Sequence, residues 1–284
     1  MSILNFKKKE KVSLLVNKDT NDLFVLAEDG RIVDLDDEMG SVLYDADTID
    51  LSNSPNIDEL PEMSAISAKK IVLNDTLRSF LDLPSAQTVC FVGLNERKYV
   101  LSSLPKNVKH LVFLGCNPEV VPLLKDKKNI QSIYWQGNVP NDLMFQLPKS
   151  LRCLTIKDSE GVSLVGLSLL RELQSLSLEN THIGPIERRP AVFFPNNLKK
   201  VWIDNVDNFS SLEGLAQESQ LKEVKIVNCQ GLDKSFCKNT PKNIELTVYG
   251  SNIPNIVTPK KVSTSKNNSF LGKFCQKIFC RTRG

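Results

Sequence analysis

The sequence predicts an α/β solenoid, in which short repeats stack side by side and share one hydrophobic core. Three observations support this fold: one apolar pattern returns through most of the chain, its spacing is nearly constant, and its strongest positions are always apolar. The clearest copy is 108–116, with apolar residues in the first, fourth and sixth places and cysteine in the ninth. A single copy could belong to any half-buried strand, so the prediction depends on the recurrence.

Ten copies of the pattern can be aligned, and they begin at Ala46, Ala68, Ala86, Val108, Ile130, Leu151, Leu173, Leu198, Leu221 and Asn243. The steps between successive starts are 22, 18, 22, 22, 21, 22, 25, 23 and 22 residues. All twenty residues in the fourth and sixth places are apolar, although apolar residues form only 41% of the chain. A unit this small cannot bury its apolar stripe alone and must stack on its neighbours. For the step of 18, either the unit is shortened on its outer side or the alignment is wrong.

The repeated pattern, Leu-x-x-Leu-x-Leu-x-x-Asn/Cys, resembles that of leucine-rich repeats. The resemblance implies a leucine-rich-repeat solenoid with a curved parallel sheet on the concave face, and short helices, 3-10 turns and loops on the convex face. Residues 119–124, 164–173 and 211–216 lie between strand segments and suit such short helices. Cys116 and Cys229 occupy the ninth place, where we expect reduced, buried cysteines that cap the inner turn.

Four units carry a proline just before the strand segment, in 104–107 (Leu-Pro-Lys-Asn), 147–150 (Leu-Pro-Lys-Ser), 194–197 (Phe-Pro-Asn-Asn) and 240–243 (Thr-Pro-Lys-Asn). In this respect the chain resembles the bacterial LPX-type leucine-rich repeat effectors, and the proline-containing FNIP repeats of some eukaryotes are a rival resemblance. The bacterial resemblance implies a virulence protein delivered into a host cell. Some of those effectors carry a ubiquitin-ligase domain after the repeats, but only 33 residues follow Ser251. We therefore expect a non-catalytic member, a scaffold that binds a host protein.

The repeat array is expected to span 46–255, with a smaller region on each side. Residues 12–16, 23–26 and 32–35 are short apolar runs, and the Asp29-Gly30 pair between the last two favours a tight hairpin turn. Because the end of a repeat stack must be covered, residues 1–45 are expected to form an N-terminal β cap. Residues 256–284 are expected to form a basic linker followed by a C-terminal amphipathic helix or tail.

The C-terminal tail has an apolar stripe with helical spacing: Phe270, Phe274 and Ile278 are four residues apart, and lysines and arginines lie elsewhere. One interpretation is a helix that covers the open end of the last repeat. A second is a basic helix docked on an anionic membrane or on a partner, with Cys275 and Cys280 as palmitoylation sites. A disordered tail is the third.

Composition narrows the class of protein. A net charge of +3 is too small to indicate a nucleic-acid partner. The first eleven residues hold four lysines without a following signal-peptide apolar run, and no stretch approaches the roughly 18 apolar residues of a membrane span. Seven cysteines without paired spacing do not indicate a disulfide framework. We expect an intracellular protein or, for an effector, one secreted without a cleaved signal peptide into the host cytoplasm, with membrane association left open.

The sequence offers few of the residues and motifs that catalytic sites use. There are only two histidines, His110 and His182, and no HExxH, CxxC or glycine-rich phosphate loop. We therefore expect no catalytic residues, metal, cofactor or small-molecule substrate. The alternative is a cysteine-dependent enzyme on a repeat scaffold, in which Cys90 and His110 of successive units would pair.

Binding of a protein partner is the more natural use of a repeat face. Side chains alternate along a strand, so residues in the fifth and seventh places should face the concave side. An apolar run there indicates an interaction site, and Trp202 resembles an aromatic anchor with a polar rim. The candidate partner-binding residues are Val92, Val112, Leu114, Tyr134, Trp202, Lys225 and Tyr249. A loop or the N-terminal cap folded over this face is the alternative, as is a peripheral membrane protein positioned by its tail (Phe270, Phe274, Cys275, Ile278, Cys280).

Overall fold

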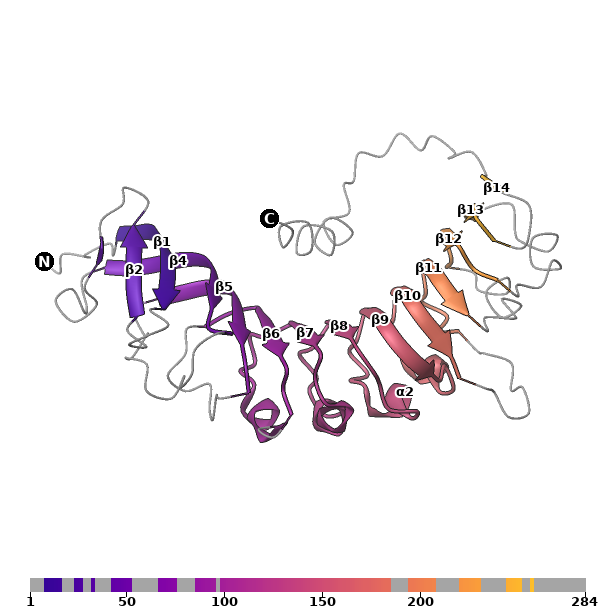
Figure 1. Cartoon of the computed structure of the whole chain (residues 1–284), viewed down its shortest axis with the longest axis horizontal. Coiled ribbons are helices and arrows are strands. Elements are labelled where there is room, and N and C mark those ends of the chain that lie inside the picture. Colours follow the sequence, from indigo (N-terminus) through magenta and orange to yellow (C-terminus); the bar gives the residue numbers. More distant parts are fainter. Residues whose placement is uncertain are drawn as a thin grey trace, which may run out of the picture.

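A computed structural model of the chain describes residues 8–16, 23–27, 32–33, 42–52, 66–75, 85–95, 98–184, 194–207, 220–230, 244–251 and 256–257. These residues form a curved solenoid (Figure 1). One sheet lines the inner, concave side of the arc, and loops with a few short helices form the outer side. The strand order in this part of the chain is β14-β13-β12-β11-β10-β9-β8-β7-β6-β5-β4-β1-β2-β3.

Each strand of the concave sheet pairs in parallel with the strand of the next unit. The strands are β4 (Val42–Asp50), β5 (Ile66–Leu73), β6 (Thr88–Val92), β7 (His110–Leu114), β8 (Ser132–Gln136), β9 (Cys153–Val162), β10 (Ser175–Ile183), β11 (Lys200–Asp207), β12 (Glu223–Val227) and β13 (Glu245–Tyr249). On the outer side lie η2 (Lys98–Ser103), η3 (Pro118–Leu124), α2 (Leu143–Gln146) and η4 (Leu167–Leu169). The predicted solenoid with a parallel sheet is therefore confirmed.

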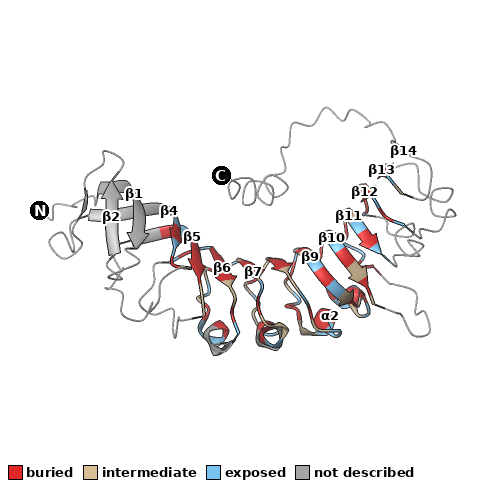
Figure 2. Cartoon of the chain, in the orientation of Figure 1, coloured by how far each residue is buried: buried red, intermediate tan, exposed pale blue. Residues whose placement is uncertain are grey.

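Strand pairing agrees with the sequence alignment in every unit, including the short one. Ile71 pairs with Val89 and Leu73 with Phe91, so the step of 18 is a real shortening between the two strands. All twenty residues in the fourth and sixth places are at most 2% exposed and belong to one continuous core. Buried and more exposed residues consequently alternate along strands such as β9 and β10 (Figure 2).

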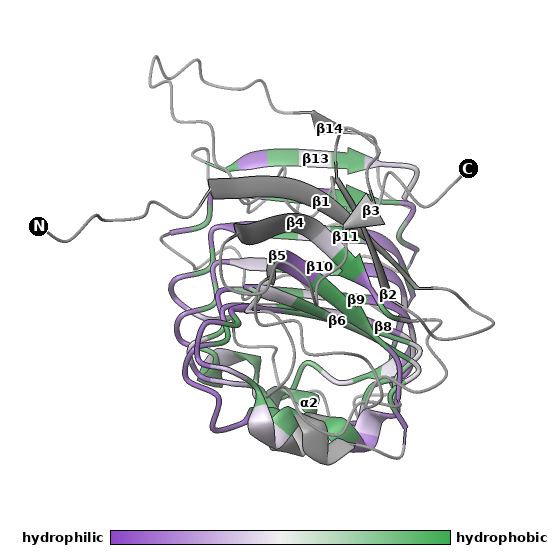
Figure 3. Ribbon diagram, turned by 90° about the vertical axis from the view of Figure 1, so that its left-hand side faces the viewer, coloured by the Kyte–Doolittle hydropathy of each residue, from purple (hydrophilic) through white to green (hydrophobic). Residues whose placement is uncertain are grey.

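The core lies between the sheet and the outer loops, as the view along the arc shows (Figure 3). Its largest side chains stack in the sixth places of consecutive units. The ring centroids of Phe91 and Phe113 are 5.5 Å apart, and those of Phe113 and Trp135 are 4.6 Å apart. Aromatic pairs of this kind add about 0.5–1.5 kcal/mol beyond the burial of their area. The middle of the array is thus held together by more than aliphatic contacts.

In the units that begin at 108 and 221, the ninth-place cysteine caps the turn that follows the strand. The thiol of Cys116 donates to the Phe91 carbonyl at 3.5 Å and accepts from the Leu94 N–H at 3.3 Å. The thiol of Cys229 donates to the Val227 carbonyl at 3.2 Å. Both cysteines are buried and free, and burial raises the pKa of each thiol. The prediction that these two cysteines are buried and cap the turn is confirmed.

The eighth place has a conformational requirement that the sequence analysis missed. Eight consecutive units place a residue with positive φ there: Gly93, Gly115, Gly137, Asp158, Asn180, Asn205, Asn228 and Gly250. Only glycine, asparagine and aspartate adopt this left-handed conformation readily. A column of these three residue types two places after the last core residue was the signal that could have revealed the turn.

The proline before the strand closes a turn. The carbonyls of Pro105, Pro148 and Pro195 each accept a hydrogen bond from the N–H three residues later, at 3.1, 3.1 and 3.0 Å. Asn107, the third residue of its turn, donates from Nδ2 to the Ala86 carbonyl of the preceding unit at 2.7 Å. The proline motif therefore shapes the entry to the strand and links neighbouring units. The fourth copy, 240–243, lies outside the described residues.

Strands before the array lie at the three apolar runs of the N-terminal region. They are β1 (Lys8–Val16), β2 (Leu23–Ala27) and β3 (Ile32–Val33). β2 pairs antiparallel with β1 and with β3, whereas β1 pairs in parallel with β4. The sheet thus continues past the first repeat into the N-terminal region. Strand β4 begins at Val42, four residues before the expected start of the repeat array at residue 46.

At the other end, β14 (Ile256–Val257) pairs antiparallel with β13. The predicted C-terminal helix lies outside the described residues, together with Phe270, Phe274, Cys275, Ile278 and Cys280. The same is true of the expected outer helix at 211–216.

Candidate functional site

The candidate site is the side of the sheet that faces away from the core. Cross-strand pairing brings residues in the fifth place of each unit into one row, and Val72, Cys90, Val112 and Tyr134 are consecutive members of it. These four form a hydrophobic cluster separate from the main core, and Val92 and Leu114 pack against it from the seventh places. We call these six residues the apolar patch. Four of the predicted partner-binding residues are therefore brought together, and Val72 and Cys90 join them.

Burial within the apolar patch is deeper than the sequence analysis assumed. Val112 is 4% exposed and Tyr134 is 9% exposed, whereas Val92 and Leu114 are half-buried. Since the sheet curves toward this face, side chains of neighbouring strands converge and cover one another. Leu114 and Val92 are consequently the members that a partner could reach most readily, and the fifth-place row forms the floor beneath them.

Cys90 and His110 lie on neighbouring strands but are not directly opposite each other. Cys90 lies opposite Val112 and His110 opposite Thr88, so the two side chains are out of register along the sheet. Burial raises the pKa of the Cys90 thiol to about 11, although the charge of Lys70 partly opposes this. At neutral pH the reactive thiolate is then a fraction of about 10⁻⁴ of this cysteine. Burial and, secondarily, Lys109 lower the pKa of His110.

The remaining predicted residues lie on the C-terminal part of the same face. Trp202 of β11 lies opposite Lys225 of β12, and the ammonium nitrogen is 4.3 Å from the centroid of the indole ring. Trp202 Nε1 is buried without a hydrogen-bond partner among the described residues. Tyr249 of β13 is the most exposed of the group, at 61%. The structure therefore divides the predicted binding residues into two groups, the apolar patch and a Trp202–Lys225 pair with Tyr249 one strand beyond.

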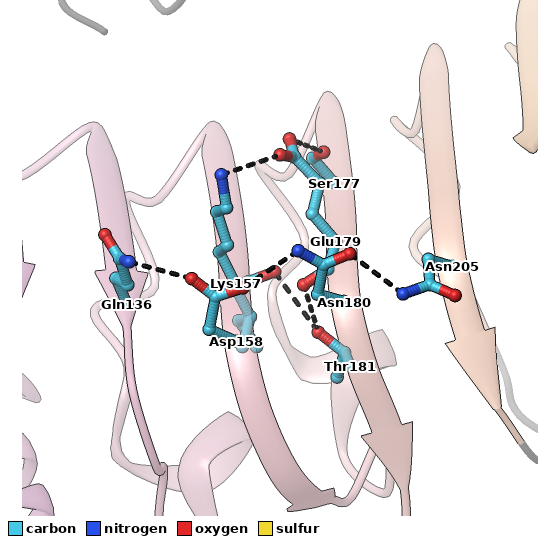
Figure 4. A network of polar contacts seen from close by, with 9 residues as sticks. Gln136, Lys157, Asp158, Ser177, Glu179, Asn180, Thr181 and Asn205 are labelled. Atoms are coloured by element: carbon cyan, nitrogen blue, oxygen red, sulfur yellow. Dashed lines mark hydrogen bonds and ion pairs between the residues drawn. The ribbon is translucent and has the colours of Figure 1, made fainter. Parts of the chain in front are cut away.

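Polar side chains connect the strands between these groups (Figure 4). Asp158 accepts hydrogen bonds from Gln136 Nε2 at 2.7 Å and from Asn180 Nδ2 at 2.9 Å, and Asn180 Oδ1 accepts from Asn205 Nδ2 at 3.0 Å. Lys157 lies 3.9 Å from Glu179, which accepts a hydrogen bond from the Ser177 hydroxyl at 3.1 Å. We call the chain of hydrogen bonds through the eighth-place residues Asp158, Asn180 and Asn205 the ladder. The sequence analysis did not predict it.

Further along the sheet, the Lys200 ammonium lies 2.8 Å from the Glu223 carboxylate. From β9 to β13 the fifth-place row consists of Thr155, Ser177, Trp202, Lys225 and Thr247. We call the outward side chains of β9–β13 the polar half of the face. The face thus changes from apolar to polar between β8 and β9.

No protein-family model matches the chain, and comparison with curated proteins finds no similar sequence. Within the described ranges, no three histidine, cysteine, aspartate or glutamate side chains are grouped so that they could hold a metal ion. The helices described here include none with the length and apolar character needed to cross a membrane.

Proposed function

We propose that this chain is a leucine-rich-repeat protein of the LPX type that acts without catalysis, as a scaffold or adaptor that binds a partner protein on its concave face. The apolar patch carries the proposal. A contiguous apolar cluster on the outward face of a sheet that is otherwise polar is typical of an interaction site. Binding energy in such sites concentrates in a central group of apolar and aromatic side chains with a polar surround.

The repeat assignment is supported by three features, one shared by all units and two found in some of them. The core places match the leucine-rich pattern, the ninth-place thiols cap the turn, and the proline turn precedes the strand in the units that begin at 108, 151 and 198. Strands β1–β3 extend the same sheet and are suited to cover the first repeat as an N-terminal cap. The resemblance of the sequence to LPX-type effectors adds to the proposal that the partner is a host protein and that the chain acts inside a host cell.

The test compares two substitutions at equivalent places on the two parts of the face. Leu114→Asp changes the apolar patch, and Val227→Asp changes the polar half at the same seventh place, where the side chain is also half-buried. Quantitative affinity purification from a host-cell lysate should show a partner that is recovered with the wild type and with Val227→Asp but lost with Leu114→Asp. Thermal unfolding of both variants checks that they remain folded.

If every protein recovered by the wild type is recovered equally by Leu114→Asp, the apolar patch is not the binding site. If Val227→Asp alone loses the partner, the site lies near Trp202 and Lys225 instead.

A further inference from the structure

We propose that, in the free protein, the apolar patch is covered by the C-terminal segment 270–279 of the same chain, so that a partner must displace this segment to bind. The inference rests on the proposed function, because it assigns a competing occupant to the same site. The segment lies outside the described residues, and the argument uses its sequence, the dimensions of the patch and the length of chain between them.

The dimensions of segment and patch agree. The fifth-place row of the patch crosses β5 to β8, and three inter-strand spacings of about 4.8 Å make it roughly 14 Å long. Phe270, Phe274 and Ile278 fall on one side of a helix, and eight residues at about 1.5 Å each separate the first from the last by roughly 12 Å. One helix laid across the strands thus places its three large apolar side chains along the row.

The connecting chain is long enough. The last described strand ends at Val257, beside β13, and the twelve residues 258–269 lead from there to Phe270. Fully extended, they reach about 40 Å. The near edge of the patch, at β8, is five inter-strand spacings from β13, or roughly 24 Å along the sheet, and the direct path across the concave side is shorter. A tether of this length holds the segment near the patch at an effective concentration of about millimolar.

Charge also favours this occupant. The tail from 260 onward carries basic residues and no acidic ones. At the edge of the patch, Asp50 of β4 lies opposite Val72 of β5. The outward charged side chains on or just after the patch strands and the strands next to them include three carboxylates, Asp50, Asp75 and Asp158, and two ammonium groups, Lys70 and Lys157. Carboxylates therefore outnumber ammonium groups where the lysines and arginines of the tail would lie.

The experiment uses the full chain in buffer without lipid. A photo-reactive benzoylphenylalanine replaces Phe274 on the apolar stripe or, as a matched control, Gln276 off the stripe. After irradiation, we expect cross-links from position 274 to β6, β7 or β8 within one chain, and a marked loss of them both in the control and when Leu114→Asp is added. A triple variant, Phe270→Asp with Phe274→Asp and Ile278→Asp, should increase the fluorescence of an apolar dye, and adding Leu114→Asp should remove the increase.

Other occupants give different results. Cross-links to β13 or β14 mean that the segment covers the last repeat, and cross-links only between chains mean that a second copy occupies the patch. Absence of cross-links, with sedimentation on phosphatidylserine vesicles that requires residues 262–284, means that the segment binds membranes. Each of these results overturns the inference, yet a partner lost with Leu114→Asp would still support the proposed function. Conversely, intramolecular cross-links without any such partner would support the inference and contradict the proposed function.

Discussion

The apolar patch and the polar half share one backbone geometry and differ in the side chains they place on it. In both regions the strands pair in parallel, residue opposite equivalent residue. The fourth- and sixth-place side chains beneath them are buried to the same extent. In the patch, fifth-place side chains pack into a second hydrophobic cluster. In the polar half, contacts across the strands are hydrogen bonds, ion pairs and one cation–π contact. The repeat therefore constrains only the core and turn places and leaves the outward places available for binding.

The largest difference should appear when a charge is placed in the same row of each part. Tyr134→Asp puts a carboxylate into the patch floor, where burying a charge without a partner destabilises the fold by about 3 kcal/mol. Thr155→Asp, in the next strand and the same row but half-buried, should change the free energy of unfolding by less than about 0.5 kcal/mol. Urea unfolding of both variants measures the difference, and equal destabilisation would contradict the division of the face.

A smaller effect is expected in the ladder of the polar half. Asn180→Ala forces alanine into a left-handed conformation and removes the hydrogen bonds to Asp158 and Asn205, so it should cost about 1–2 kcal/mol. Asn180→Gly removes the same hydrogen bonds but tolerates the positive φ, and should destabilise less. If the glycine variant is the less stable of the two by urea unfolding, the conformational explanation is wrong.

The contact between Trp202 and Lys225 should contribute less again. A double-mutant cycle with Trp202→Leu and Lys225→Met isolates the interaction, which at a half-exposed site is worth about 0.5–1 kcal/mol. The coupling energy is obtained from the unfolding free energies of the four proteins. A value indistinguishable from zero would mean that the ammonium rests on the ring without stabilising it.

The smallest effect concerns pH and belongs to the apolar part. Burial lowers the pKa of His110 below its ordinary 6.5, so the unfolded chain binds this proton more readily than the folded one. Stability from this group is therefore full above pH 6.5 and is lost as the pH falls through 6.5 toward the lower folded pKa. Comparing His110→Gln with the wild type by unfolding at pH 7.5 and pH 5.5 should show a weaker pH dependence in the variant. An unchanged dependence would exclude His110 as its source.

Periodicity revealed the core because core places carry a strong and redundant requirement. Ile71 and Val89 align despite the shortened step, since a one-residue slip would turn the whole apolar set outward. The outward residues have no such requirement. The sequence therefore predicted which residues face outward but not how deeply each of them is buried. Val112 and Tyr134 are covered because neighbouring strands bring similar side chains together, which no single repeat encodes.

The amino-acid sequence alone determined the repeat length, the alignment of the units and the residues that line the core, because each unit must bury an apolar stripe that it cannot hide by itself. Tertiary structure decided the rest. The curvature of the stacked strands joins Val72, Cys90, Val112 and Tyr134 into one cluster, and the left-handed turns align Asp158, Asn180 and Asn205 into a ladder. Both depend on contacts between side chains of different units, which exist only once the units are stacked.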